Sequence, residues 1–218
     1  MTGERGPGVN SARHGENAVF LLTFGFGFAL IPVAILIARI FSIDIAALLR
    51  PGGDAIAWGV AATLPLVAAL VWFMRATQRS VAAFRDSQIE FFSRIGFRLT
   101  RARIIALSLL AGVSEELLFR GVFQTIAEER LPLVFAIVLP GVLFGALHAR
   151  SIAYAAIAAC VGVYLGVLFW MTQSLTAAVI THSLYDFIAF EWTRRILDKN
   201  QDRDKSGRAR SSGSSVTG

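Results

Sequence analysis

The segment AVFLLTFGFGFALIPVAILIA occupies residues 18–38 and contains no charged side chain. A second uncharged segment, AIAWGVAATLPLVAALVWFM, occupies residues 55–74. About 20 apolar residues in a helix cross the ~30 Å hydrocarbon core of a bilayer, because each residue advances the helix by ~1.5 Å. The two segments therefore predict two transmembrane helices. The composition agrees, since 55% hydrophobic residues and a mean hydropathy of +0.61 are too apolar for a soluble domain of 218 residues.

The apolar pattern continues in the second half of the chain, but there it is interrupted by ionisable side chains. Its length and its interruptions predict four further helices, over residues 104–127, 131–149, 151–171 and 174–192. Residues 131–171 carry only one formal charge, Arg150, so a bent or re-entrant piece near Pro140 also fits this part. The predicted fold is all-α, a polytopic transmembrane helical bundle of about six spans.

The distribution of basic residues predicts the orientation of the bundle, because Lys and Arg near span ends stay on the cytoplasmic side. With six spans and both termini inside, the inner segments hold 17 of the 21 Lys and Arg residues, whereas the outer segments hold Arg39, Arg50 and Arg130. We therefore expect an N-in and C-in, multi-pass protein of the cell inner (plasma) membrane. The net charge of +6 fits contact with the lipid bilayer and its anionic headgroups, and we expect no nucleic-acid partner.

Composition divides the chain into five parts. Residues 1–17 and 193–218 are polar and have too little apolar surface to fold alone, so we expect disordered tails. Residues 18–74 hold two N-terminal transmembrane helices, and residues 104–192 hold a four-helix membrane core. Residues 75–103 interleave Phe and Ile with seven Arg, which predicts a helix lying in the cytoplasmic membrane interface. The alternative is a solvated basic loop.

Six ionisable residues within the predicted core form the candidate site: Glu115, Glu116, Arg120, His148, His182 and Asp186. An ionisable group inside a membrane costs at least ~2.5 kcal/mol on insertion scales, so such residues indicate function by default. By helical rise the two glutamates lie roughly 17 Å inside the third span, and His182 lies at a similar depth in the sixth. The alternative interpretation is that these groups are polar pairs that hold the helices together.

Helical spacing separates the two acids. Glu116 and Arg120 are four residues apart with the acid first, which favours an intrahelical ion pair. Glu115 points ~100° away around the helix, so it does not share that arginine equally and is left to face a cavity or another helix. A glutamate without an ion-pair partner is available as a general base.

The same spacing of four residues recurs on two later helices. His182 and Asp186 share one face of the sixth, where Asp186 either orients the imidazole or joins it in binding a water or a substrate oxygen. Phe144 and His148 share one face of the fourth, where the ring could wall the histidine into an apolar pocket.

These residues resemble the motifs of the CAAX protease and bacteriocin-processing (CPBP, or Abi) intramembrane proteases. Glu115-Glu116-Leu117-Leu118-Phe119-Arg120 is similar to the EExxxR motif of that family. Phe144 to His148 is similar to its FxxxH motif, and His182 to Asp186 is similar to its third motif, a His followed four residues later by Asn or Asp. The resemblance covers about residues 95–190, with the three motifs in the family's order.

The resemblance implies roles for the six residues. Glu115 would activate a water with help from His148, His182 and Asp186 would stabilise the oxyanion, and Glu116 and Arg120 would hold the site together. Asp186 stands where the prenyl-protein enzymes carry Asn, so it would need a proton in order to donate a hydrogen bond. We expect no cofactor; if the enzyme does use zinc, Glu115, His148 and His182 are the candidate ligands.

The predicted function is an intramembrane endopeptidase that cleaves a membrane-associated peptide or protein. One alternative is a non-catalytic immunity or scaffold protein of the same fold. Another is a proton-coupled transporter, against which the absence of inverted-repeat signs weighs. The sequence contains no HExxH motif, so it does not predict a metalloprotease of the site-2 type.

Overall fold

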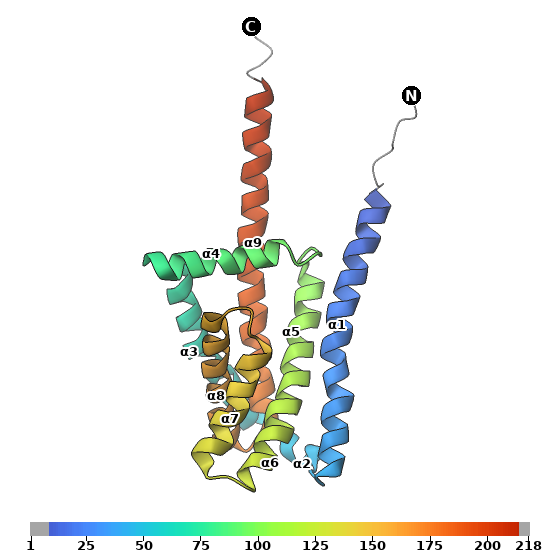
Figure 1. Cartoon of the computed structure of the whole chain (residues 1–218), viewed down its shortest axis with the longest axis vertical. Coiled ribbons are helices and arrows are strands. Elements are labelled where there is room, and N and C mark those ends of the chain that lie inside the picture. The colour runs from blue at the N-terminus through green and yellow to red at the C-terminus, as the bar shows by residue number, and fades with distance from the viewer. Residues whose placement is uncertain (1–8, 214–218) are drawn as a thin grey trace.

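The computed structural model describes the backbone of residues 9–213, and these residues form an all-helical bundle (Figure 1). In chain order its elements are α1 (Val9–Ile40), α2 (Ile45–Leu49), α3 (Gly53–Arg75), α4 (Arg79–Ser93), α5 (Arg101–Glu116), η1 (Leu117–Gln124), α6 (Thr125–Glu128), α7 (Leu133–Leu147), α8 (Ile152–Thr172) and α9 (Leu175–Gly213). The predicted fold class, a polytopic helical bundle, is confirmed. The chain is a membrane protein.

Within the described part of the chain, three helices are long and apolar enough to cross a membrane by themselves, over His14–Ile40, Gly53–Arg75 and Ile152–Thr172. The remaining predicted spans are α5 continued by η1 and α6, the short apolar α7, and the first half of α9. The start of α1 and the end of α9 lie at the same end of the bundle (Figure 1). This arrangement fits an even number of crossings.

Helix α4 lies across the bundle, nearly perpendicular to the long helices and at the end from which α1 and α9 project (Figure 1). Arg85 of α4 donates hydrogen bonds of 3.1 and 3.0 Å to the carbonyl oxygens of Met74 and Ala76, at the C-terminal end of α3. These bonds satisfy carbonyl groups that a helix end leaves without partners. They also fix the angle at which α4 leaves α3.

The structure is helical over most of residues 1–17 and 193–218, for which the sequence predicted disordered tails. Helix α1 begins at Val9, so residues 9–17 are helical, and α9 continues to Gly213 through most of the other predicted tail. Residues 1–8 and 214–218 lie outside the described part of the chain. The physical reason is that extending an existing helix is much easier than starting one. In α9 the i,i+4 pair of Arg194 with Asp198, at 2.6 Å, adds to this extension.

Helices α7 and α8 form a close hairpin. A Cβ atom on Gly141 would lie 2.8 Å from the backbone nitrogen of Val163, and one on Gly145 would lie 2.5 Å from the carbonyl oxygen of Ala155. Helix α7 runs through Pro140 without a break, but its 15 residues reach only about 22 Å. It therefore ends inside the bundle, and this depth decides where the following residue, His148, lies.

Candidate active site

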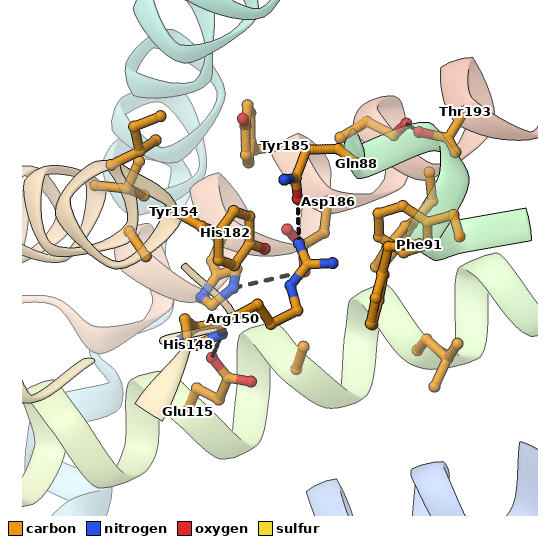
Figure 2. Close-up of a pocket in the computed structure, with 18 of the residues that line it drawn as sticks. Gln88, Phe91, Glu115, His148, Arg150, Tyr154, His182, Tyr185, Asp186 and Thr193 are labelled. Carbon is orange, nitrogen blue, oxygen red and sulfur yellow. Dashed lines mark hydrogen bonds and ion pairs between the residues drawn. The ribbon is translucent and has the colours of Figure 1, made fainter. Parts of the chain in front are cut away.

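A cavity of about 790 Å³ opens between the helices and brings the polar residues of three motifs together. Glu115 of α5, His148 after α7, and His182 and Asp186 of α9 all line it. Figure 2 shows these four side chains grouped on one side of the cavity, with α4 closing the other. Most of the remaining lining is apolar, including aromatic rings from α4.

Glu116 lies behind this cavity and is completely buried. Its Oε1 atom accepts a hydrogen bond of 2.7 Å from Arg120 Nη1 and lies 2.7 Å from His182 Nδ1. Arg120 is equally buried, and its Nη2 donates to the carbonyl oxygen of Gly162 on α8. Glu116 and Arg120 therefore join α5, η1, α8 and α9. The ion pair that the spacing predicted is present, but the contact between Glu116 and His182 was not predicted.

The segment that follows the two glutamates is a π-helix, η1, in which backbone hydrogen bonds reach one residue further than in an α-helix. It carries Arg120 and Gln124, and both side chains donate to α8: Gln124 Nε2 donates to the carbonyl oxygen of Gly166 at 2.9 Å. A Cβ atom on Gly166 would lie 2.8 Å from Gln124 Oε1, so a larger residue there would require the end of the Gln124 side chain to shift. Short π-helical segments are frequent at functional sites.

Glu115 faces His148 across a gap. Glu115 Oε2 and His148 Nε2 are 3.7 Å apart, which is too long for a direct hydrogen bond. Glu115 Oε2 is also buried without a hydrogen-bond partner among the described residues. His148 Nδ1 lies 2.8 Å from the carbonyl oxygen of Phe144, which only accepts, so Nδ1 carries a proton. In a neutral His148 the lone pair of Nε2 therefore faces Glu115.

Phe144 packs against both histidines of the site. Its ring centroid lies 4.4 Å from that of His148 and 5.8 Å from that of His182, the second contact being edge-on. The guanidinium carbon of Arg120 lies 5.2 Å from the Phe144 ring centroid on the buried side. Phe144 thus contacts the guanidinium of the buried ion pair as well as both histidines, a wider role than the wall for His148 that its spacing predicted.

His182 connects the buried ion pair to the cavity. Its Nδ1 atom is held by Glu116, and its Nε2 atom lies 3.6 Å from Asp186 Oδ2, four residues further along α9. The carboxylate of Glu116, already paired with Arg120, is the acceptor in the first contact, so Nδ1 of His182 donates. The imidazole is therefore oriented from behind, and Nε2 faces the cavity beside Asp186.

Several residues of the cavity were not identified from the sequence, among them Gln88, Arg150, Tyr154 and Tyr185. In the sequence Arg150 stands out only as the single formal charge of residues 131–171. The available signal was its position two residues after His148, which places it close to that residue in any fold. Tyr185 likewise precedes Asp186 directly, whereas Gln88 of α4 and Tyr154 of α8 are brought to this place by packing.

The three candidate zinc ligands, Glu115, His148 and His182, are not arranged to bind one metal ion. Within the described part of the chain, no three His, Cys, Asp or Glu side chains are placed to bind one metal ion. Glu115, His148 and His182 line the same cavity, but each histidine lies beside a different carboxylate. In this arrangement the three residues do not fit a zinc site.

Comparisons with known proteins bear on the same residues. A family model described as Rce1-like, type II CAAX prenyl endopeptidase Rce1-like, matches residues 98–188. Neither a curated protein nor a solved structure matches the chain. The matched segment extends from the loop before α5 into α9 and contains all three motifs. Residues 98–188, with all six residues of the candidate site, are therefore similar to the Rce1-like family of CAAX endopeptidases.

Proposed function

We propose that this protein is an intramembrane endopeptidase in which Glu115 and His148 activate a water molecule. The observation that carries the proposal is the gap of 3.7 Å between Glu115 Oε2 and His148 Nε2 at the wall of the cavity. A water molecule at ordinary hydrogen-bond distance from both atoms fits such a gap. The match of residues 98–188 to the family model supports the reaction class, and this geometry supports the roles.

The proposed reaction needs one proton acceptor that later becomes a donor. Glu115 accepts a proton from the water as its oxygen attacks the carbonyl carbon of the scissile peptide bond. His148 accepts the second hydrogen bond of that water at Nε2, because Phe144 holds the proton of the ring on Nδ1. When the C–N bond breaks, the proton on Glu115 moves to the leaving nitrogen, and the carboxylate is restored.

His182 and Asp186 are proposed to stabilise the oxyanion of the tetrahedral intermediate. His182 Nδ1 donates to Glu116, so Nε2 donates as well only when the ring carries both protons. The carboxylates of Glu116 and Asp186, on either side of the ring, favour that cation. In this scheme Asp186 supports the charge of His182 and needs no proton of its own. The pair Glu116 and Arg120 positions the imidazole.

The substrate is proposed to be a peptide or protein segment in the membrane. The family implies a peptide or protein substrate, and the apolar lining of the cavity suits a chain that arrives from the bilayer. We place the protein in the inner (plasma) membrane with α4 on the cytoplasmic side, because residues 75–103, which include α4, carry seven arginines.

The test is a comparison of cells that carry the wild-type protein with cells that carry Glu115→Ala. Quantitative proteomics of the membrane fraction and of secreted peptides should show an uncleaved precursor that accumulates in the variant. Gly25→Ala on α1 is a matched control for expression, because no atom lies within 4 Å of the Cβ it adds. If the Glu115→Ala variant fully complements a strain from which the gene has been deleted, and no precursor accumulates, the protein acts as a scaffold and the proposal is wrong.

A further inference from the structure

Arg150 lies in the turn between α7 and α8 and extends into the mouth of the cavity. Its guanidinium carbon lies 3.9 Å from the ring centroid of Phe91 on α4 and 4.0 Å from that of Tyr154 on α8. Its Nη2 atom donates a hydrogen bond of 2.5 Å to Gln88 Oε1 on α4. Figure 2 shows the guanidinium between the side chains of His148 and Asp186 and those of Gln88 and Phe91 on α4.

Among the described residues, no carboxylate lies within 4.0 Å of the Arg150 guanidinium. The other arginine that lines the cavity, Arg85, is engaged with the end of α3 and with Asp86. Arg150 is therefore a cation at the mouth of an apolar cavity whose partners are two aromatic rings and one neutral amide. None of these partners neutralises its charge.

The chemistry of the guanidinium indicates what this arrangement binds. It is planar and carries five N–H donors along its edge, and aromatic rings pack against its faces. Phe91 and Tyr154 are the aromatic partners here, and Gln88 uses one of the donors. The remaining edge donors suit a carboxylate, which accepts two parallel hydrogen bonds from an arginine.

We propose that Arg150 binds a carboxylate of the substrate and thereby determines which peptides are cleaved. This inference rests on the proposed endopeptidase function. Tyr154 contacts both Arg150 and the His148 ring, whose centroid lies 6.4 Å from that of Tyr154. These two contacts in series place the guanidinium carbon within about 10 Å of His148. An extended peptide advances ~3.3 Å per residue, so the carboxylate lies no more than a few residues from the bond that is cleaved.

Two sources supply this chemistry, the C-terminal carboxylate of a peptide or an acidic side chain near the bond. A lipid phosphate at the membrane surface is the competing ligand. The position of Arg150 favours the substrate, because its side chain lines the same cavity as Glu115 and its guanidinium lies against the ring of Phe91 on α4.

The experiment uses the full chain in vesicles and three pools of quenched-fluorescent decapeptides of randomised sequence, each carrying a palmitoyl anchor. One pool has a free C-terminal carboxylate, one is amidated without acidic residues, and one is amidated with a glutamate near the C-terminus. We expect kcat/KM for an anionic pool to exceed that for the neutral pool by about 10- to 100-fold, as for a hydrogen bond to a charged group. The preferred pool identifies the source of the carboxylate.

The decisive variants are Arg150→Gln and, as the matched control, Gln88→Ala. Arg150→Gln should reduce the ratio of kcat/KM for the anionic pools to kcat/KM for the neutral pool to about one. Gln88→Ala removes only the hydrogen bond between α4 and Arg150, so this ratio should stay as in the wild type. If both variants lower cleavage of all pools alike, Arg150 only holds α4 in place and the proposal is overturned. An effect of Arg150→Gln that requires phosphatidylglycerol in the vesicles, with no dependence on peptide charge, would assign the site to lipid and also overturn it.

The same assay separates the two proposals. Wild-type protein that cleaves the pools without preference for a carboxylate contradicts the role of Arg150 and leaves the endopeptidase function in place. Wild-type protein that cleaves none of the pools contradicts the endopeptidase function, and the role of Arg150 with it.

Discussion

Arg120 of the π-helical segment η1 donates a hydrogen bond to the carbonyl oxygen of Gly162 in α8, 42 residues further along the chain. The same guanidinium is paired with Glu116 at 2.7 Å, and both side chains are buried. A buried ion pair is stable only when its charges and its remaining donors find partners. The contact with Gly162 supplies one of these partners and ties the motif to the neighbouring hairpin.

Arg120→Gln is expected to destabilise the protein by about 3–5 kcal/mol, because it leaves the buried carboxylate of Glu116 without its cation. Thermal unfolding in detergent measures this loss. The double variant Glu116→Gln with Arg120→Gln should unfold at a higher temperature than Arg120→Gln alone, since it removes the unpaired charge. Additive losses in the double variant would show that the two residues are not coupled.

Glu115→Gln is expected to lower kcat by about 10²- to 10⁴-fold with little change in unfolding temperature, because Glu115 faces the cavity and holds no other element in place. Glu116→Gln is the matched comparison at the adjacent position. It should lower the unfolding temperature as well as activity, since Glu116 contacts both Arg120 and His182. Equal effects of the two substitutions on unfolding would contradict the different roles of the two glutamates.

Gly141→Ala is expected to destabilise the hairpin of α7 and α8 by about 1–3 kcal/mol, because its Cβ atom would lie 2.7 Å from Val163 Cγ2 and 2.8 Å from Val163 N. Gly25→Ala is the control, since no atom lies within 4 Å of its added Cβ and alanine favours a helix. Unfolding of the two variants side by side measures the difference. If Gly141→Ala were as stable as the wild type, α7 and α8 would be able to move apart without a loss of stability, and the close packing would contribute nothing.

Activity is expected to persist in the presence of a chelator, because the proposed water is activated by Glu115 and His148 themselves. Metal analysis of the purified, active protein should find zinc well below the molar amount of protein. Loss of activity in chelator that returns on addition of zinc, but not of magnesium, would support instead the ligand set of Glu115, His148 and His182.

Much of the candidate site could be predicted because its pairs are local. Glu116 with Arg120, and His182 with Asp186, are four residues apart, and one helix turn brings such residues together in any fold. The separation of Glu115 from Glu116 follows from the ~100° between successive residues of a helix. The π-helix η1 lacks such a signal, because its sequence has the same apolar pattern that predicts an α-helix.

The sequence by itself determined the membrane location, the helical class and the motifs, because long apolar segments and short helical spacings depend only on neighbouring residues. Tertiary structure decided which motif residues meet. His182 reaches Glu116 across 66 residues, and His148 meets Glu115 because α7 ends inside the bundle. It also placed Arg150 between Phe91 and Tyr154. These contacts depend on how closely helices pack, which is set by glycines and side-chain shapes on different helices and has no local signal in the chain.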